Sequence, residues 1–168
     1  MTRLRAISAS DRSPIESILR ASDAFSASEI SVALELLDLS TSGRDPSYRF
    51  LAAESDGGRL SGYLCFGEIP LTRGAIDLYW IAVDPREARR GVGRALVERM
   101  IDTLRTEGAR KIYVETSSRS PYASARAFYR RVGFRQLVEY VDFYAPGDSK
   151  IVFERDVAPT PGGAGTHP

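Results

Sequence analysis

The chain has 168 residues, of which 43% are hydrophobic and 27% charged, and its formal net charge is +1. These values predict one globular domain and argue against nucleic acid or an anionic membrane as a partner. The single cysteine, Cys65, excludes an intramolecular disulfide or a cysteine-based metal cluster, and the single histidine, His167, argues against a Ser-His-Asp triad or a histidine-ligated metal. The sequence shows no signal-peptide pattern and no membrane-spanning apolar run, so we expect a cytoplasmic protein.

The first part of the chain predicts one strand followed by two helices. Residues 2–8 alternate enough for a strand. Ser13-Pro14-Ile15-Glu16 is typical of a helix start, with serine as the cap, proline in the first turn and glutamate returning to the cap. A second capping box, Ser26-x-x-Glu29, precedes apolar residues at helical spacing: Ile30, Ala33, Leu34 and Leu37.

The middle of the chain predicts three strands. Segments 48–55 and 59–69 flank Asp56-Gly57-Gly58, which is a strong hairpin signal. Segment 75–83, AIDLYWIAV, is apolar on both faces, as a central strand would be.

The second half predicts a helix after Gly93, which Gly108 can end, and a hairpin around Pro146-Gly147-Asp148. The other expected elements are a strand at 111–117, a helix at 123–132 ended by Gly133, and strands at 134–144 and 149–157. The order is therefore β-α-α-β-β-β-α-β-α-β-β. We expect an α/β fold with a mixed sheet of about seven strands, helices on both faces, one domain over residues 1–157 and a disordered tail over 158–168.

The segment REARRGVGRALVERM, residues 86–100, places Gly91 and Gly93 between the 75–83 strand and the next helix. The unpaired N–H groups of a helix N-terminus form an anion site, and glycines let a ligand approach them. A tight loop with a solvated basic rim is the alternative interpretation. The dinucleotide pattern G-x-G-x-x-G is absent because Leu96 replaces the third glycine, and no Walker pattern occurs. The positive charge here comes from Arg86, Arg89, Arg90 and Arg94.

WIAVDPREARRGVGRALVERM resembles the acyl-CoA-binding motif of the GNAT superfamily of acetyl-CoA-dependent N-acyltransferases. ARAFYRRVGFRQ resembles the second motif of that superfamily, A-x-x-F-Y-x-x-x-G-F, and the element order over residues 2–157 also matches. Two positions depart from the pattern. Ala88 stands where the family usually has Arg or Gln, so we expect Arg89 or Arg90 to compensate, and Tyr122 stands where the second motif often opens with Asn.

The resemblance implies acetyl-CoA as the co-substrate and no metal. Its diphosphate would lie on N–H groups of residues 89–94, and its pantetheine arm would pair with residues 81–83, where strands 75–83 and 111–117 splay apart. A backbone N–H near Ile81 would polarise the thioester oxygen. The implied cofactor-binding residues are Ile81, Ala82, Val83, Arg89, Arg90, Gly91, Val92, Gly93, Arg94, Tyr122 and Phe128.

The resemblance makes Tyr129 the general acid that protonates the leaving thiolate, although periodicity alone would make it a core aromatic. For the general base we expect Glu115 slightly ahead of Asp77, and a water relay is a third option. Glu115 could instead pair with an arginine, and Asp77 in a central strand needs a partner or water in any case. We interpret Cys65 as a buried apolar residue and not as an acyl carrier.

The function implied is direct transfer of an acetyl group from acetyl-CoA to a primary amine of a small molecule, by a monomer or homodimer. The alternatives are an enzyme that acetylates peptide or protein N-termini and a catalytically silent acyl-CoA sensor. A nucleic-acid binder that uses the arginine cluster is disfavoured by the net charge. Residues expected near the acceptor, or else in the sheet core and hairpin rim, are Phe25, Tyr79, Trp80, Tyr140, Asp142, Phe143 and Tyr144.

Overall fold

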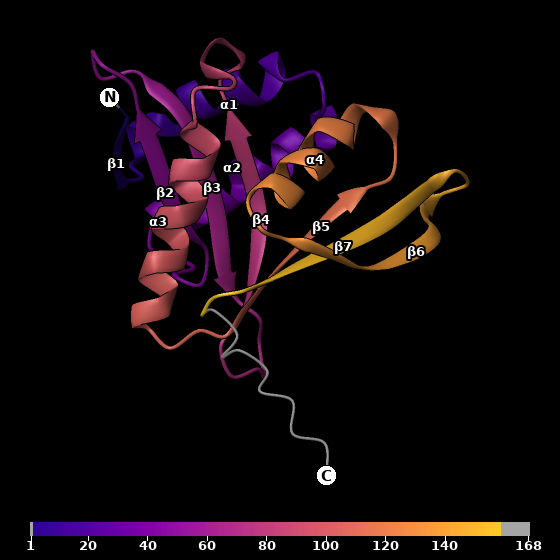
Figure 1. The fold of residues 1–168 in the computed structure, drawn as a ribbon. Helices are drawn as coiled ribbons and strands as arrows, with labels where there is room; N and C mark the ends of the chain where they lie inside the picture. Colours follow the sequence, from indigo (N-terminus) through magenta and orange to yellow (C-terminus); the bar gives the residue numbers. More distant parts are fainter. Residues whose placement is uncertain (1, 159–168) are drawn as a thin grey trace.

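The structure, a computed structural model, describes residues 2–158, and seven strands in it form one mixed sheet in the order β1-β2-β3-β4-β5-β7-β6 (Figure 1). The predicted order of elements and the α/β fold class are confirmed, whereas residues 159–168 of the predicted tail lie outside the described residues. The strands are β1 (Arg3–Ala6), β2 (Arg49–Glu54), β3 (Leu60–Glu68), β4 (Ala75–Val83), β5 (Lys111–Ser117), β6 (Arg135–Ala145) and β7 (Asp148–Asp156). The helices are α1 (Arg12–Ala21), α2 (Ala27–Thr41), α3 (Val92–Thr106) and α4 (Ala123–Arg131).

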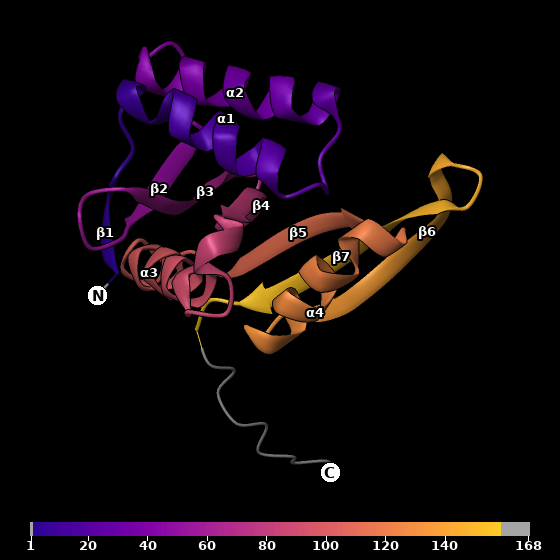
Figure 2. The same cartoon turned by 90° about the horizontal axis from the view of Figure 1, so that it is seen from above.

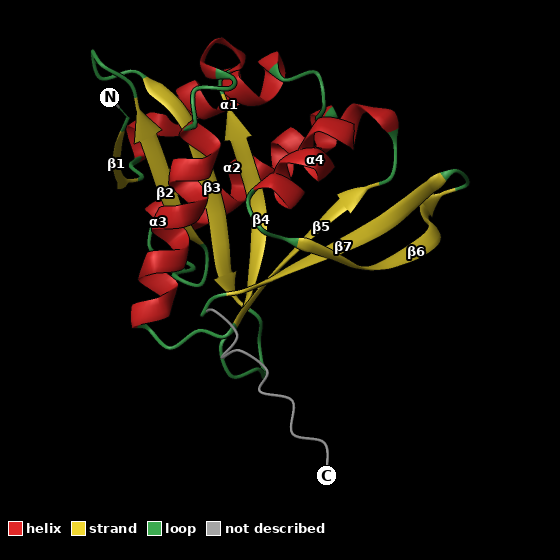
Figure 3. Ribbon diagram, viewed as in Figure 1, coloured by secondary structure: helices red, strands yellow, loops and turns green. Residues whose placement is uncertain are grey.

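Helices cover both faces of the sheet, as the sequence predicts. The pair α1 and α2 lies over β2–β4 on one face, and α3 and α4 lie on the other face (Figures 2 and 3). Each pair buries its own apolar cluster against the sheet. Within residues 2–158, no helix is both long enough and apolar enough to cross a membrane.

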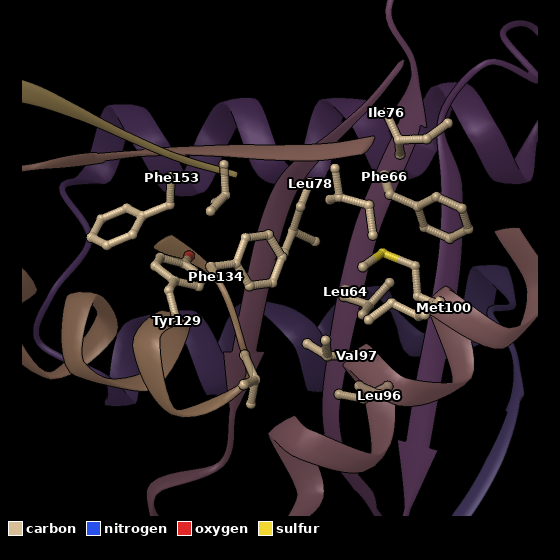
Figure 4. Close-up of a cluster of buried hydrophobic side chains, with 14 of the residues drawn as sticks. Leu64, Phe66, Ile76, Leu78, Leu96, Val97, Met100, Tyr129, Phe134 and Phe153 are labelled. Carbon is tan, nitrogen blue, oxygen red and sulfur yellow. The ribbon is translucent and has the colours of Figure 1, made fainter. Parts of the chain in front are cut away.

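The apolar stripe of α3 forms the centre of the larger cluster, which also includes α4 and side chains of β3, β4, β5 and β7 (Figure 4). Leu96, Met100 and Leu104 of this stripe are all fully buried. Gly108 has a φ of 79° just after the helix, which confirms it as the terminating residue.

Most element bounds agree with the sequence, and β4 and β5 match their predicted ranges completely. The predicted start of α1 was wrong. Ser13 is not the cap: the helix begins at Arg12 with Asp11 as its N-cap, and Glu16 pairs with Arg20 at 2.6 Å. Asp11 instead closes a capping box with Ser8 one turn earlier. The box predicted for α2 is confirmed.

The capping box of α2 is formed by Ser26 and Glu29. The Ser26 N–H donates to Glu29 Oε2 at 2.7 Å, and the Glu29 N–H donates to Ser26 Oγ at 3.2 Å. Two otherwise unpaired donors of the first turn are thereby satisfied. The helix that follows buries Leu37 on its inner side and leaves Val32 exposed.

This packing predicts that Leu37→Ala lowers the free energy of unfolding by about 2–5 kcal/mol, because a fully buried leucine leaves a cavity. Val32→Ala, on the exposed side of the same helix, should cost less than about 1 kcal/mol. Urea denaturation followed by circular dichroism measures both. Equal losses in the two variants would contradict the orientation of α2.

Candidate active site

The loop between β4 and α3 is anchored by two buried carboxylates. Asp84 accepts hydrogen bonds from the backbone N–H of Arg86 at 3.0 Å and from its guanidinium at 2.7 Å, which keeps the pKa of the Asp84 carboxyl below its usual range. Glu87 accepts hydrogen bonds from Arg59 at 2.6 Å and from Arg90 at 3.1 Å. These contacts fix the chain that leads into α3.

The first turn of α3 presents N–H groups without protein acceptors. Gly91 is the N-cap, and its carbonyl accepts the first helical hydrogen bond from Ala95 at 2.9 Å. Among the described residues, the N–H groups of Gly91, Val92, Gly93 and Arg94 have no acceptor. Together with the positive end of the helix dipole, they make a site suited to an anion such as a diphosphate.

The two glycines of this turn serve different purposes. Gly91 has a φ of 81°, in the left-handed region, and a Cβ built there would meet nothing within 4 Å, so the space above the turn is open. A Cβ at Gly93 would lie 3.0 Å from the ring of Phe128. Gly93 therefore lets α4 approach the first turn of α3, and the structure brings these two predicted cofactor residues together.

Three of the four arginines around this turn bind protein groups. Arg86 pairs with Asp84, Arg90 pairs with Glu87, and Arg94 donates to the carbonyl of Arg131 at 3.1 Å. Arg89 has a φ of 64° and makes no hydrogen bond or ion pair with any described residue. Of the two residues expected to compensate for Ala88, Arg89 is the one left available to a ligand.

The pairing between β4 and β5 stops early. The two parallel strands pair at Ala75–Asp77 with Lys111–Tyr113 and then diverge (Figure 1). From residue 78 to residue 83, β4 keeps its antiparallel partner β3 but has no described strand on the β5 side. The expected splay is therefore present, and residues 81–83 line it. Backbone groups on this side can pair with the amides of an extended ligand.

A β-bulge at Tyr79 decides which side chains of β4 meet which face. Cys65 pairs with Trp80 and Phe66 pairs with Leu78, so Tyr79 is the extra residue. Before the bulge, Ile76 and Leu78 face α3, and after it Ile81 and Val83 do. Asp77 and Trp80 therefore face the other side, where α1 and α2 lie.

Tyr129 lies on the α3 and α4 side of the sheet. It is 7% exposed and packs between Phe134 and Phe153, with ring centroids 5.9 and 5.8 Å away (Figure 4). Burial raises the pKa of its hydroxyl, and this hydroxyl donates to no described residue. The residue is thus both a core aromatic, as its periodicity indicates, and a tyrosine that keeps its proton near neutral pH.

Asp77 and Glu115 lie on the opposite face, together with Lys150; we call Asp77, Glu115 and Lys150 the carboxylate face. Glu115 is 51% exposed and pairs with Lys150 at 3.2 Å, so its partner is a lysine and not an arginine. Asp77 is half-buried and makes no ion pair or hydrogen bond with any described residue. Burial raises the pKa of the Asp77 carboxyl, the Glu115 charge raises it further, and Lys150 lowers it.

The hydroxyl of Tyr122 is hydrogen-bonded to a residue of α2. It donates to Glu29 Oε1 at 2.8 Å, and burial with this bond raises the pKa of Tyr122 to about 12. Glu29 belongs to the capping box of α2, so the bond joins the start of α2 to the start of α4. Burial raises the pKa of the Tyr144 hydroxyl, and the nearby charges of Glu115 and Glu29 raise it further.

The residues expected near the acceptor fall into two groups. Phe25 and Trp80 contact edge to face at 5.4 Å beside the α1 and α2 cluster, and Tyr79 packs on Tyr48 at 5.5 Å. The second group stands exposed on the β6–β7 hairpin and comprises Tyr140, Asp142, Phe143 and Tyr144. Cys65 is fully buried, and burial raises the pKa of its thiol, in line with its interpretation as an apolar residue. Across residues 2–158, no three His, Cys, Asp or Glu side chains are grouped so as to hold a metal ion.

Sequence reasoning missed Lys150, Glu29 and the two loop anchors Asp84 and Glu87 as residues of this region. The anchors carry a local signal, an acid two or three residues before an arginine. The sequence predicts Glu29 only as part of a capping box. Its contact with Tyr122 joins residues 93 positions apart, which no local pattern indicates. Lys150 reaches Glu115 because β7 pairs with β5, which no local pattern encodes.

Comparisons with known proteins agree with this geometry. The family model for the acetyltransferase (GNAT) family matches residues 15–134. A GNAT-family protein of known structure from Desulfovibrio desulfuricans is 35% identical, covers 94% of this chain and 100% of its own, and superposes with a TM-score of 0.88.

Two curated relatives match shorter segments. The mycothiol acetyltransferase of Clavibacter michiganensis is 36% identical over 101 residues, which cover 59% of this chain and 30% of that protein. The ribosomal protein bS18-alanine N-acetyltransferase of Escherichia coli is 37% identical over 73 residues, which cover 44% of this chain and 48% of that enzyme. The matches thus span less than half the length of these relatives. The family model covers most of the chain, and the chain belongs to the acetyltransferase (GNAT) family.

Proposed function

We propose that this protein transfers the acetyl group of acetyl-CoA to a primary amine of a small molecule. The observation that carries the proposal is the gap between β4 and β5, which has Tyr129 on one face of the sheet and Asp77 on the other. A thioester held in the gap would be open to an acid from the side of α4 and to an amine and a base from the carboxylate face.

The residues present fit acetyl-CoA. Among the described residues, the N–H groups of residues 91–94 have no acceptor and suit its diphosphate, and Arg89 has no ion-pair partner and adds positive charge. The side of β4 that faces away from β3 has no described strand beyond residue 77 and suits the amides of its pantetheine arm. Acetyl-CoA would supply an activated acetyl thioester. The chain's own groups must then bind it, accept a proton from the amine and give a proton to the leaving sulfur.

Asp77 is our choice for the general base. An alkylamine titrates near roughly 10.4 and must be neutral to attack. As the amine nitrogen bonds to the acetyl carbon and the carbon–sulfur bond breaks, Asp77 takes the proton that the nitrogen loses. Glu115 is less suited, because Lys150 already neutralises it and half of its side chain is in solvent.

Tyr129 is our choice for the general acid. Its raised pKa keeps the hydroxyl protonated, and no described residue competes for that proton. The hydroxyl can therefore donate to the sulfur as it leaves and recover its proton from solvent. Phe128, Phe134 and Phe153 hold the ring in place.

In favour of a small acceptor, the bond between Tyr122 and Glu29 joins the start of α2 to the start of α4, and we infer that it restricts the approach of a bulky acceptor to the carboxylate face. A protein N-terminus is the second candidate. It is favoured by the Escherichia coli relative, whose name specifies a ribosomal protein alanine, and by the exposed aromatic side chains of the β6–β7 hairpin.

One assay separates these candidates. The protein is incubated with acetyl-CoA and either a panel of small primary amines or peptides with varied N-terminal residues, and release of free CoA thiol is followed. Turnover with small amines supports the proposal, and turnover confined to peptides supports the second candidate. Tight acetyl-CoA binding without turnover in either panel would identify a sensor.

Gly91→Glu should raise the dissociation constant of CoA at least about tenfold, because it places a negative charge and a strained left-handed residue at the diphosphate site. Gly91→Asn is the matched control, since asparagine tolerates this backbone conformation without adding charge, and it should bind within about threefold of the wild type. Calorimetric titration measures both. Unchanged binding by the glutamate variant would place the diphosphate elsewhere.

Tyr129→Phe should lower kcat about 10²-fold or more by removing the general acid. Because the hydroxyl donates to no described residue, CoA affinity and melting temperature should stay close to wild type. Steady-state kinetics with calorimetric CoA binding separates these effects. Wild-type kcat in a folded variant would remove Tyr129 from the mechanism.

Asp77→Asn should lower kcat/KM about 10²-fold or more, whereas Glu115→Gln should retain activity. A base acts when it is deprotonated, so activity falls as the pH drops through its pKa. An ordinary aspartate has a pKa of about 3.9. Because the pKa of Asp77 is raised, the loss of activity should begin at a higher pH than for an ordinary aspartate. Glu115→Gln removes a charge that raises this pKa, so its acidic limb should move to lower pH. Profiles of kcat/KM against pH test this, and the reverse pattern would make Glu115 the base.

A further inference from the structure

The ammonium group of Lys150 is enclosed by protein groups on the carboxylate face. Its Nζ lies 3.2 Å from Glu115 Oε1, 4.2 Å from the ring centroid of Phe143 and 5.3 Å from that of Tyr140. The lysine side chain is only 16% exposed. A carboxylate together with two aromatic faces is an arrangement that binds ammonium ions. The chain therefore contains a built cation site and fills it with its own lysine.

The two rings reach Lys150 by different routes. Tyr140 is its direct cross-strand partner on β6. Phe143 belongs to an irregular segment, residues 141–144, which leaves the register of β7. Asp142 holds this segment with a φ of 53°: its N–H donates to Ser149 Oγ at 3.2 Å, and its Oδ1 accepts from the Gly147 N–H at 2.8 Å. The excursion thus has a defined geometry that places a ring over the lysine.

The other carboxylates near this site are Asp77, Asp148 and Glu29. Asp77, on β4, feels both Glu115 and Lys150. Asp148, at the start of β7, accepts from the Ser117 hydroxyl, and Glu29, on α2, accepts from Tyr122. Lys150 and Glu115 therefore neutralise each other, whereas Asp77 has no charged partner in contact among residues 2–158.

We propose that Lys150 is a specificity-determining residue. It occupies the cation site formed by Glu115, Phe143 and Tyr140, and it therefore disfavours binding of acceptors whose second positive charge would need that site. The preferred acceptor is then an amine whose far end is uncharged or apolar. This inference rests on the proposed function, because it names which amines that function accepts. Emptying the site should convert it into a site for a second ammonium group.

The test compares binding of α,ω-diaminoalkanes with that of monoamines of equal chain length. Trp80 is the sole tryptophan and stands on this side of β4, so its fluorescence reports binding without acetyl transfer. Wild-type protein should bind the two series equally well or favour the monoamines. In Lys150→Ala the diamines should gain at least about tenfold in affinity over the monoamines.

The controls assign the gain to this site. Lys150→Arg refills the site with a cation and should keep the wild-type preference. Lys111→Ala removes the chain's only other lysine, which pairs with Glu154 and Asp156, and should also keep it. Adding Glu115→Gln to Lys150→Ala removes the carboxylate and should abolish most of the gain. Lys150→Ser repeats the test with a second small side chain if Lys150→Ala does not fold.

A measurement on the wild-type protein needs no variant. Because the Nζ of Lys150 lies over two ring faces, the neighbouring Cε protons should resonate upfield of those of Lys111. Equal shifts for the two lysines, or an unchanged diamine preference in a folded Lys150→Ala or Lys150→Ser, would overturn the proposal. Neither readout requires acetyl transfer, so a failure of the proposed function and a failure of this inference give different results.

Discussion

β4 and β5 pair in parallel at Ala75–Asp77 with Lys111–Tyr113 and then part. Each strand stays paired on its other side, β4 with β3 and β5 with β7, so two stable half-sheets meet at one end and open at the other. Unpaired backbone groups are costly to bury, and the open side of β4 is therefore suited to a partner that supplies amides. In the proposed reaction this partner is the pantetheine arm.

The bulge in β4 beside the gap decides which face of the sheet each side chain joins. The bulge at Tyr79 shifts β4 so that its apolar residues keep facing α3 while Asp77 and Trp80 face the other side. Tyr129 lies in the apolar cluster on the α3 and α4 face, and Asp77 lies on the other face near Glu115 and Lys150. In the proposed reaction these two environments suit opposite roles, with Tyr129 giving a proton and Asp77 accepting one.

Much of this could be predicted from the sequence, because the signals are local. The box of Ser26 and Glu29, the both-faces-apolar strand 75–83 and the stop at Gly108 each depend on a few neighbouring residues. The predicted start of α1 was wrong because the capping box of Ser8 and Asp11 starts a helical turn earlier, at Ala9–Asp11, which leaves Ser13 inside the helix. The pairing of the arginines, the ion pair of Lys150 with Glu115 and the partial burial of Asp77 depend on strand register and packing, which no local sequence pattern encodes.

The most direct test of the central claim is a crystal structure of the protein with acetyl-CoA. The account predicts the diphosphate within hydrogen-bond distance of the N–H groups of residues 91–94, and the pantetheine amides paired with β4 in the gap beside β5. A complex whose phosphates lie elsewhere, with the gap closed by the protein's own side chains, would contradict it.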